Sequence, residues 1–342
     1  MVDPHAEAIV AGAISAWMSP LEETLLGTAD PPEIVRLLDG FCVSNLGDRL
    51  GTLMFYRRGV GAVFGVVLRD GRRVVVKVHR LELVPQGLDG VRRVQERLAA
   101  LGLPAPRPLG DPSPLGRGVA SAEEMLTAGR ALDAHRPEVR RALAEGLRRF
   151  VEAAMPMRET VHLPLAHPFD LPPNDLWPPA HDLRFDLRLP GGEWIDEIGA
   201  AARAVLEEPA GPTVIGHMDW RAENLRLNGG LAAIFDWDSV KLCPEPALVG
   251  ANATTFTGNW SDSRVDPYPS IEETAAFVAE YMSAKGLPLS RGEVRTANAA
   301  RLYHLAYNAR CEYSDASLGF FPSLNTDRGW RSLLRDHQGL VR

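Results

Sequence analysis

The sequence predicts an α+β protein with two lobes, an antiparallel sheet with a helix followed by a mostly helical region. Three observations lead to this prediction. Short apolar and β-branched runs, separated by turn residues, fill residues 52–78. Segments whose apolar residues recur at helical spacing dominate the second half of the chain. The length of 342 residues is sufficient for two lobes, each with its own core.

The composition is that of an ordinary globular protein, with 45% hydrophobic and 24% charged residues. The three cysteines (Cys42, Cys243 and Cys311) lie far apart, which argues against a disulfide framework and predicts a cytoplasmic protein. The start lacks the basic region of a signal peptide, and no apolar run approaches the length of a membrane span. The net charge of −7 disfavours a nucleic-acid partner and favours a cationic one, while the oligomeric state stays open.

Three strands are expected after a helical extension over residues 1–45. The third strand carries Lys77 near its end, and a turn with Gly59 and Gly61 joins the first two strands. An Arg-Asp-Gly-Arg turn makes the second and third strands a hairpin. The predicted strands are residues 52–56, 62–68 and 73–78.

Helices are expected where apolar residues recur every three or four positions. A proline-rich stretch over residues 155–190 interrupts this series and is too long for an ordinary connection, so we interpret it as a substrate-binding insert. The predicted helices are residues 91–101, 137–154, 194–206, 271–285 and 293–312.

The most informative segment begins at His217 and ends at Asp238. Asp219 is followed five residues later by Asn224, and after a short hairpin by Asp236. Phosphoryl transfer needs one carboxylate that orients the attacking hydroxyl, and an amide and a second carboxylate that hold Mg²⁺. Mg²⁺ takes hard oxygen ligands and keeps several waters, so Asn224 and Asp236, assisted by Asp238, are sufficient. The alternative, a hairpin whose polar residues only cap turns, accounts for one or two of these residues but not for four.

This pattern, with Asp236-Trp237-Asp238 after the first motif, resembles the aminoglycoside phosphotransferase and choline kinase-like families, which share the protein-kinase fold. The resemblance implies an enzyme that transfers phosphate from ATP to a hydroxyl of a small molecule with Mg²⁺. It also implies a nucleotide-binding lobe over residues 46–128 and a helical catalytic lobe over residues 129–342.

In these families a strand lysine binds the α- and β-phosphates, and an acid on the following helix pairs with it. Lys77 matches the lysine. Glu96 is our choice for the acid, nineteen residues later. Counting back from the proline pair that follows the helix favours an earlier position, so Gln95 and Asp89 remain alternatives.

The resemblance also places the nucleotide's other contacts. Gly59 and Gly61 would form a phosphate flap, although their spacing departs from the protein-kinase glycine motif. The adenine would bind the backbone around Glu124, Met125 and Thr127. Backbone recognition does not distinguish ATP from GTP.

Roles in the catalytic loop follow from the same resemblance. Asp219 would accept or orient the proton of the acceptor hydroxyl. Arg221 would supply positive charge to the γ-phosphoryl group. His217 would support the loop rather than act as an acid or base. Met218 and Trp220 depart from the residues usual in these families and indicate a divergent branch.

The acceptor is expected to be a small molecule, because Pro244-Glu245 follows the second motif at once and leaves no room for a protein-docking segment. An aminoglycoside-type antibiotic is the leading class. A sugar, amino alcohol or other metabolite is the alternative, and a nucleotide-binding pseudokinase is a third. Four acidic residues are candidates for a cleft that receives a cationic acceptor, against the alternative that they are solvated surface: Asp262, Asp266, Glu312 and Asp315.

Overall fold

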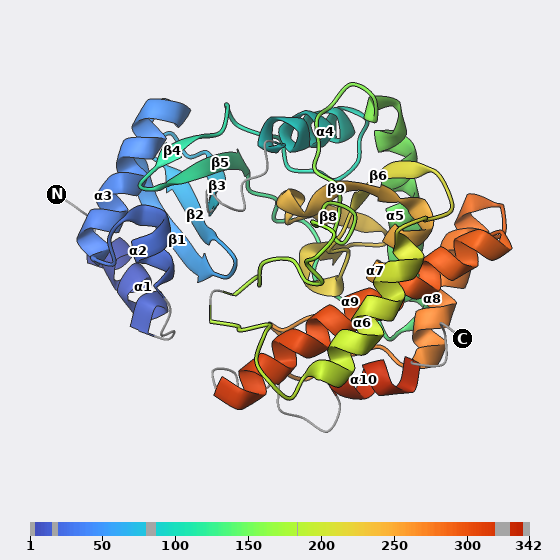
Figure 1. Cartoon of the computed structure of the whole chain (residues 1–342). Coiled ribbons are helices and arrows are strands. Elements are labelled where there is room, and N and C mark those ends of the chain that lie inside the picture. Colours follow the sequence, from blue (N-terminus) through green and yellow to red (C-terminus); the bar gives the residue numbers. More distant parts are fainter. Residues whose placement is uncertain (1–3, 16–19, 80–86, 183, 319–328, 338–342) are drawn as a thin grey trace. The chain divides into compact units, whose positions relative to one another are not determined.

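The computed structural model describes residues 4–15, 20–79, 87–182, 184–318 and 329–337 (Figure 1). The chain forms two compact units. Unit 1 comprises Met1–Ala100, Ala105–Thr127 and His181–Arg184, and unit 2 comprises Leu101–Pro104, Ala128–Ala180 and Phe185–Arg342. An antiparallel sheet in the first unit and a mostly helical second unit confirm the predicted α+β class.

Unit 1 is built on a five-stranded antiparallel sheet with the order β1-β2-β3-β5-β4. The three predicted strands are confirmed, the first being longer by two residues at each end. The strands are β1 (Leu50–Arg58), β2 (Ala62–Leu68), β3 (Arg73–His79), β4 (Ser113–Leu115) and β5 (Gly118–Glu124).

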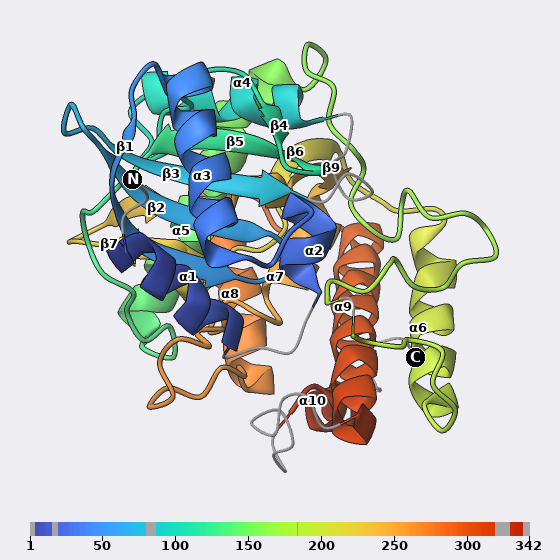
Figure 2. The same cartoon turned by 90° about the vertical axis from the view of Figure 1, so that its left-hand side faces the viewer.

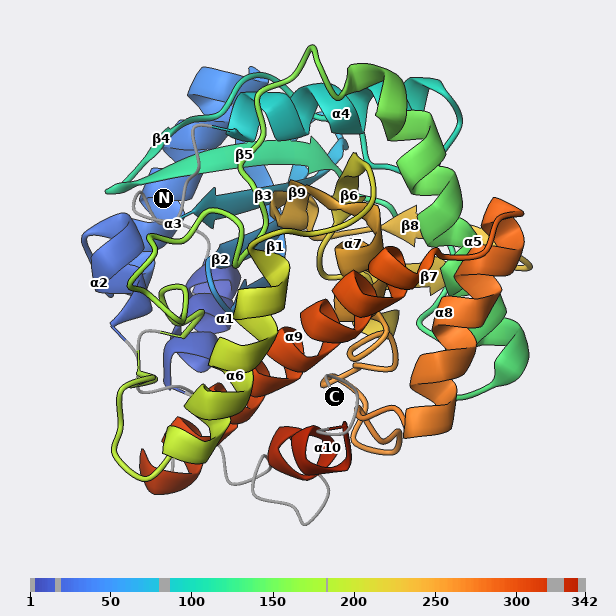
Figure 3. The ribbon, with the colours of Figure 1, turned by 45° about the vertical axis from the view of Figure 1, so that its right-hand side comes forward.

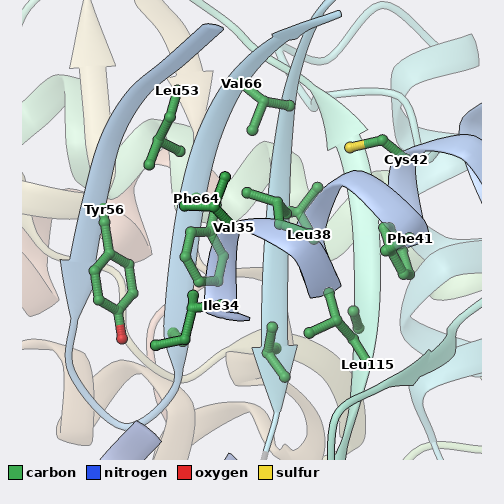
Figure 4. Close-up of a cluster of buried hydrophobic side chains, with 14 of the residues drawn as sticks. Ile34, Val35, Leu38, Phe41, Cys42, Leu53, Tyr56, Phe64, Val66 and Leu115 are labelled. Carbon is green, nitrogen blue, oxygen red and sulfur yellow. The ribbon is translucent and has the colours of Figure 1, made fainter. Parts of the chain in front are cut away.

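Helices α1 (Pro4–Ser15), α2 (Leu21–Leu26) and α3 (Pro31–Phe41) cover one face of this sheet (Figure 2). Apolar side chains of α3 pack on the even-numbered residues of β2 and β3 and form a single core, part of which is drawn in Figure 4. The opposite, odd-numbered face of β3 carries Lys77. The core therefore fixes which way the predicted nucleotide-binding lysine points.

A buried polar group joins α2 to β1. The Tyr56 hydroxyl donates to Glu22 Oε1 at 2.6 Å, and Arg58 Nη2 donates to Glu22 Oε2 at 2.7 Å. Glu22 and Arg58 form an ion pair that is almost inaccessible to solvent. Removal of either side chain would therefore leave an uncompensated buried charge.

Helix α4 (Leu88–Ala100) follows β3 and begins three residues before its predicted start. Its buried residues recur at helical spacing and form one face: Leu88, Val91, Val94, Gln95 and Leu98. The polar residue on this face, Gln95, is important for the site described below.

Unit 2 is organised around the long helix α9, against which α6, α7 and α10 pack (Figure 3). At Gly250 of α7 an added Cβ would collide with the backbone of Ala297 of α9, so this close packing requires glycine. The helices are α5 (Pro137–Ala154), α6 (Glu193–Leu206), α7 (Glu245–Asn252), α8 (Ile271–Lys285), α9 (Arg291–Leu318) and α10 (Trp330–His337).

The sequence predicted four of these helices, and α5 and α8 have the predicted bounds. Helix α9 continues six residues beyond its predicted end. None of the described helices is long and apolar enough to cross a membrane.

Two small antiparallel pairs of strands flank the two motifs that are predicted to be catalytic. The first pair is β6 (Thr213–His217) with β9 (Val240–Pro244), and the second is β7 (Leu225–Leu227) with β8 (Leu231–Ile234). The second pair is the short hairpin expected between Asn224 and Asp236, and its turn has the sequence Asn-Gly-Gly.

The proline-rich segment 155–190 is irregular apart from a short turn, Met155–Met157, in its described part. It is held to unit 2 at several points. Trp177 Nε1 donates to Asp196 Oδ1 of α6 at 2.8 Å, and the Tyr303 hydroxyl of α9 donates to the carbonyl of Leu176 at 2.7 Å.

Candidate active site

The catalytic loop of unit 2 begins at His217, the fully buried last residue of β6. Its Nδ1 accepts the backbone N–H of Asp219 at 3.2 Å, so Nε2 carries the proton and donates it to the carbonyl of Phe235 at 2.8 Å. Burial lowers the pKa of His217, which keeps the ring neutral. The imidazole thus bridges the strand before the first motif and the strand before the second.

Asp219 is held by Asn224. The Asn224 amide nitrogen donates to the Asp219 carbonyl at 3.0 Å and to its Oδ2 at 2.8 Å. Because both amide hydrogens are directed at Asp219, the amide oxygen of Asn224 points away from that carboxylate and can accept from or coordinate another group. The loop therefore presents one oriented carboxylate and one oriented amide oxygen.

Asp236 adopts a left-handed backbone conformation with φ of 64°, unlike any other non-glycine residue described. Such a conformation costs about 1 kcal/mol or more and is found where surrounding contacts impose it. Phe235 N–H donates to the carbonyl of Asn224 at 2.9 Å, which brings the second motif beside the first. Ser239 Oγ donates to Asp236 Oδ2 at 3.2 Å.

Asp238 lies in the turn Trp237–Ser239, two residues after Asp236. Its charge acts on Lys241 of β9: burial lowers the pKa of Lys241, and the Asp238 carboxylate opposes that change.

The Arg221 guanidinium lies between two carboxylates of the same loop. Its Nη1 is 3.3 Å from Asp219 Oδ1, and its Nη2 is 3.6 Å from Glu223 Oε2. Burial alone would lower the pKa of Arg221, but these carboxylates raise it above its ordinary value, so the side chain stays cationic.

Asn252, a fully buried residue at the end of α7, supports the catalytic loop and was not predicted from the sequence. Its Oδ1 accepts the Trp220 N–H at 2.9 Å, and its Nδ2 donates to the carbonyl of His217 at 3.0 Å. The available signal was an asparagine directly after the apolar run Pro246 to Ala251, because a buried amide needs hydrogen-bond partners.

Apolar packing supports the loop from the same side. The fully buried Trp220 donates its indole N–H to the carbonyl of Leu143 on α5 at 2.8 Å. The Phe150 ring of α5 lies 5.8 Å from the Trp220 ring and 6.2 Å from the His217 ring, in edge-on geometry. Trp220 is therefore part of the core that packs against the loop carrying Asp219.

A loop after α7 is attached to the catalytic loop along its length. The N–H groups of Ala222 and Glu223 donate to the carbonyls of Phe256 and Gly258 at 2.9 and 3.0 Å. Ser261 Oγ donates to Glu223 Oε1 at 2.5 Å. We call residues 256–262 the acceptor loop. Its backbone position is thus fixed relative to Asp219.

Two of the four predicted acidic substrate residues lie in or after this loop. Asp262 is bound by both Nε and Nη2 of Arg264 at 2.7 Å, and this exposed pair lowers the pKa of Asp262 to about 2. Asp266 accepts the N–H of Tyr268 at 3.0 Å, and its carbonyl contacts His135 Nε2 at 2.8 Å.

The other two, Glu312 and Asp315, are buried residues of α9. Glu312 Oε2 accepts the Arg331 N–H at 2.8 Å in the first turn of α10. A Cβ at Gly329 would collide with the Glu312 carboxylate. Burial raises the pKa of Glu312, and the Arg331 N–H and charge oppose that change. Glu312 thus serves as an N-terminal cap for α10.

The candidate nucleotide residues lie in unit 1. Lys77 stands opposite Ser121 of β5 and Val63 of β2 in the sheet. At the turn between β1 and β2, the Gly59 N–H donates to the Gly61 carbonyl at 3.0 Å. A Cβ at Gly61 would lie 2.5 Å from the Val78 carbonyl, whereas one at Gly59 would meet nothing. Gly61 is therefore required by the sheet itself, and Gly59 is not.

In the segment predicted to bind adenine, two backbone N–H groups already have partners. Glu124 N–H donates to the carbonyl of Arg107 at 2.9 Å, and Met125 N–H donates to the carbonyl of Arg73 at 3.0 Å. A ring nitrogen of adenine that accepts a hydrogen bond would therefore bind a backbone N–H after Met125, as far as the predicted Thr127. The carbonyl groups of Glu124 and Met125 could accept hydrogen bonds from the base.

Both acidic residues of α4 lie on its outer face. The side chains of Glu96 and Asp89 are 61% and 64% exposed, and each pairs with Arg92, at 3.5 and 3.0 Å. Gln95 is on the buried face. This geometry does not favour Glu96 as the partner of Lys77.

The model of one protein family, described as the phosphotransferase enzyme family, matches residues 55–244, which is more than half of the chain. The chain belongs to this family. The match begins in β1 and ends in β9, so both the Lys77 strand and the complete catalytic loop of this phosphotransferase lie within it.

Solved structures of small-molecule kinases are similar to the phosphotransferase over most of its length. Amicoumacin kinase in complex with AMP-PNP, Ca²⁺ and amicoumacin aligns at a TM-score of 0.59 and 10% identity, over 85% of this chain and 87% of that one. Spectinomycin phosphotransferase in complex with ADP and spectinomycin aligns at 0.55 and 12%, over 89% and 98%. Ethanolamine kinase from Plasmodium vivax aligns at 0.52 and 10%, over 91% and 88%.

These likenesses confirm the predicted protein-kinase-like fold, and the family match confirms the predicted resemblance and a small-molecule phosphotransferase enzyme. No curated protein matches the sequence.

Proposed function

We propose that the protein is an ATP- and Mg²⁺-dependent O-phosphotransferase that phosphorylates a hydroxyl of a small molecule, with aminoglycoside-type antibiotics as the first acceptor class. The observation that carries this proposal is the pair Asp219 and Asn224. Two hydrogen bonds, at 2.8 and 3.0 Å, orient the carboxylate and turn the amide oxygen outward. A residue that only caps a turn does not need a second side chain to orient it.

Asp219 is the group that accepts or orients the proton of the acceptor hydroxyl. Arg221, held as a cation beside it, restricts where that carboxylate can point and supplies positive charge for the transferred phosphoryl group. His217 is neutral and uses both ring nitrogens for the loop, so its role is support.

The donor set fits Mg²⁺. Asn224 and Asp236 offer oxygen atoms on adjacent segments, and Asp238 lies in the next turn. Within the described residues no group of three or more His, Cys, Asp or Glu side chains could hold a metal. A small number of protein ligands is appropriate for Mg²⁺, because the ion keeps several waters and also binds the nucleotide's phosphates. When bound, the ion would neutralise charge on those phosphates.

Lys77 binds the nucleotide's phosphates in this proposal, and the carbonyl groups near Glu124 and Met125 and the backbone up to Thr127 recognise the base. Nothing in this backbone recognition selects ATP over GTP, so both nucleotides belong in the test.

The acceptor is proposed to bind against the acceptor loop, because that loop is attached to the residues next to Asp219. Trp260 is 42% exposed there and packs edge-on against Tyr268 at 5.7 Å between ring centres. An exposed indole can hold the apolar face of a sugar ring or an ammonium group.

A second candidate, a kinase for a sugar, amino alcohol or other metabolite, is favoured by the Asp262–Arg264 pair. This pair neutralises the acidic side chain nearest the loop's end, which lowers the negative charge available to a polycationic drug. Glu312 is likewise occupied as the cap of α10.

The test is ADP release with ATP or GTP and Mg²⁺ across aminoglycosides, other hydroxylated antibiotics, sugars and amino alcohols. Acceptor-dependent release that Asp219→Asn abolishes is the expected result. Trp260→Ala should raise the KM for the responding acceptor about tenfold, without changing the KM for the nucleotide. Nucleotide binding without release on any acceptor would favour the pseudokinase alternative.

A further inference from the structure

Strand β3 of unit 1, which carries Lys77, has an acidic neighbour on β5 that the sequence analysis did not single out. Strand β5 pairs with β3 so that Lys77 stands opposite Ser121 and Val75 stands opposite Glu123. Because alternate residues of a strand point to the same face, Lys77 and Glu123 share the face opposite the apolar core. They are diagonal neighbours, a separation that long side chains can span.

The side chain of α4 that contacts Glu123 is an amide and not an acid. Gln95, 5% exposed, donates from Nε2 to Glu123 Oε2 at 2.5 Å. This bond fixes one oxygen of the Glu123 carboxylate and brings the helix to the sheet. A neutral donor does not cancel the carboxylate's negative charge, so Glu123 can also attract a cation on the same face.

The acidic residues of the helix cannot take this position. Successive helical residues are rotated by about 100°, so Glu96 points away from the face that carries Gln95. Arg92 binds both Glu96 and Asp89 on that outer side. To bring Glu96 inward, the helix would have to rotate and expose its buried residues Val91, Val94 and Leu98.

We propose that Glu123, held by Gln95, is the carboxylate that positions Lys77 for the nucleotide's phosphates. This inference rests on the proposed function. It moves the acid from the helix to a strand whose register with β3 is fixed by backbone hydrogen bonds. The neighbouring Ser121 Oγ is engaged by His79 Nε2 at 3.0 Å. Glu123 is a positioning residue, because it acts on the phosphates only through Lys77.

The test compares single and double variants in steady-state ADP release and in nucleotide binding. Glu123→Gln keeps the shape and the Gln95 contact geometry but removes the charge. It should raise the KM for ATP or lower kcat/KM for ATP by at least about tenfold. Glu96→Gln should cause a clearly smaller loss. Asp111→Asn, at a carboxylate with an 83% exposed side chain in the same unit, controls for the general loss of negative charge.

A coupling measurement separates positioning from folding. In a Lys77→Met background, Glu123→Gln should cause little further loss, because the residue it positions is gone. Glu123→Asp should recover part of the activity. Equal additional loss in both backgrounds, or a Glu96→Gln effect as large as that of Glu123→Gln, would overturn the assignment.

The same experiment distinguishes failure of this inference from failure of the proposed function. A wild-type protein that binds nucleotide and loses nothing with Glu123→Gln contradicts only the role of Glu123. A wild-type protein that binds neither ATP nor GTP contradicts both proposals.

Discussion

The catalytic loop of unit 2 and the α4–β5 region of unit 1 differ in how far their sequences reveal their geometry. In the loop, His217, Asp219, Asn224 and Asp236 lie within twenty residues, and hydrogen bonds within that segment hold them together. In unit 1, the partner of Lys77 must come from another element, and the rotation of α4 decides which residue faces inward. A motif is therefore informative where short-range bonds fix its members and less so where packing of a separate helix selects them.

Apart from replacement of Asp219 itself, the largest effect is expected at the loop's second motif. Asp236→Ala should lower kcat by about 10² or more at ordinary Mg²⁺ concentrations, because it removes a carboxylate proposed to hold the ion. The measurement is ADP release over a range of Mg²⁺ concentrations. Asp238→Ala is the matched comparison and should cause a smaller loss. Unchanged Mg²⁺ dependence in the Asp236 variant would contradict the metal assignment.

The support behind the loop gives the next largest effect. Asn252→Ala leaves the Trp220 N–H and the His217 carbonyl without their buried partner. The free energy of unfolding should fall by about 1–3 kcal/mol, and kcat should fall with it. Chemical denaturation with parallel kinetics measures both. An Asn228→Ala variant, changed in the hairpin turn between β7 and β8, should be closer to wild type in kcat; equal kcat losses would indicate that Asn252 has no special relation to the loop.

The buried histidines of unit 2 predict a loss of stability in acid. Burial lowers the pKa of His304 to about 4, from an unfolded value of about 6.5. The unfolded chain therefore binds a proton first as the pH falls, so stability is full above about pH 6.5 and decreases towards pH 4. Between pH 7 and pH 5 the contribution of His304 should fall by about 2 kcal/mol. Urea denaturation should show a shallower pH dependence in His304→Gln; an identical slope would contradict this contribution.

The smallest effect is expected at the contact between Gln95 and Glu123 in unit 1. Gln95→Glu alone would place a second carboxylate against Glu123, and it should destabilise the protein by about 1 kcal/mol or raise the pKa of one of the two groups. The double variant Gln95→Glu with Glu123→Gln restores one acid and one amide with their positions exchanged. It should be more stable than the Gln95→Glu single variant in thermal denaturation. No recovery in the double variant would show that the pair is not interchangeable.

Most of the fold could be predicted from the sequence because the patterns that indicate its helices and strands lie within each segment. The hairpin from residue 62 to residue 79 and helices α5 and α8 depend on alternation, turn residues and helical spacing within each segment. The short strands β4 and β9 lack such a pattern and form because neighbouring strands pair with them. The end of α9 was placed too early because the partners of its later residues lie far away along the chain: the Tyr313 hydroxyl donates to the carbonyl of Pro190, and Ser314 Oγ accepts the N–H of Asp186.

Prediction of the candidate site was limited in the same way, because important partners of its residues lie far away along the chain. The acidic residues predicted to receive a substrate were chosen by charge alone, and their partners decide what each can do. Arg264 binds Asp262 from two residues away, while Glu312 caps a helix that begins eighteen residues later. Asn252 was missed because its partners, Trp220 and His217, are more than thirty residues earlier.

The measurement that tests the central claim most directly is turnover and nucleotide affinity of Asp219→Ala beside wild type, with the responding acceptor. Our account predicts that turnover falls by about 10³-fold or more while the Kd for Mg²⁺-nucleotide changes little, since Asp219 acts on the hydroxyl and not on the phosphates. Turnover retained in the variant would contradict the assignment of Asp219 and, with it, the proposal that this loop is catalytic.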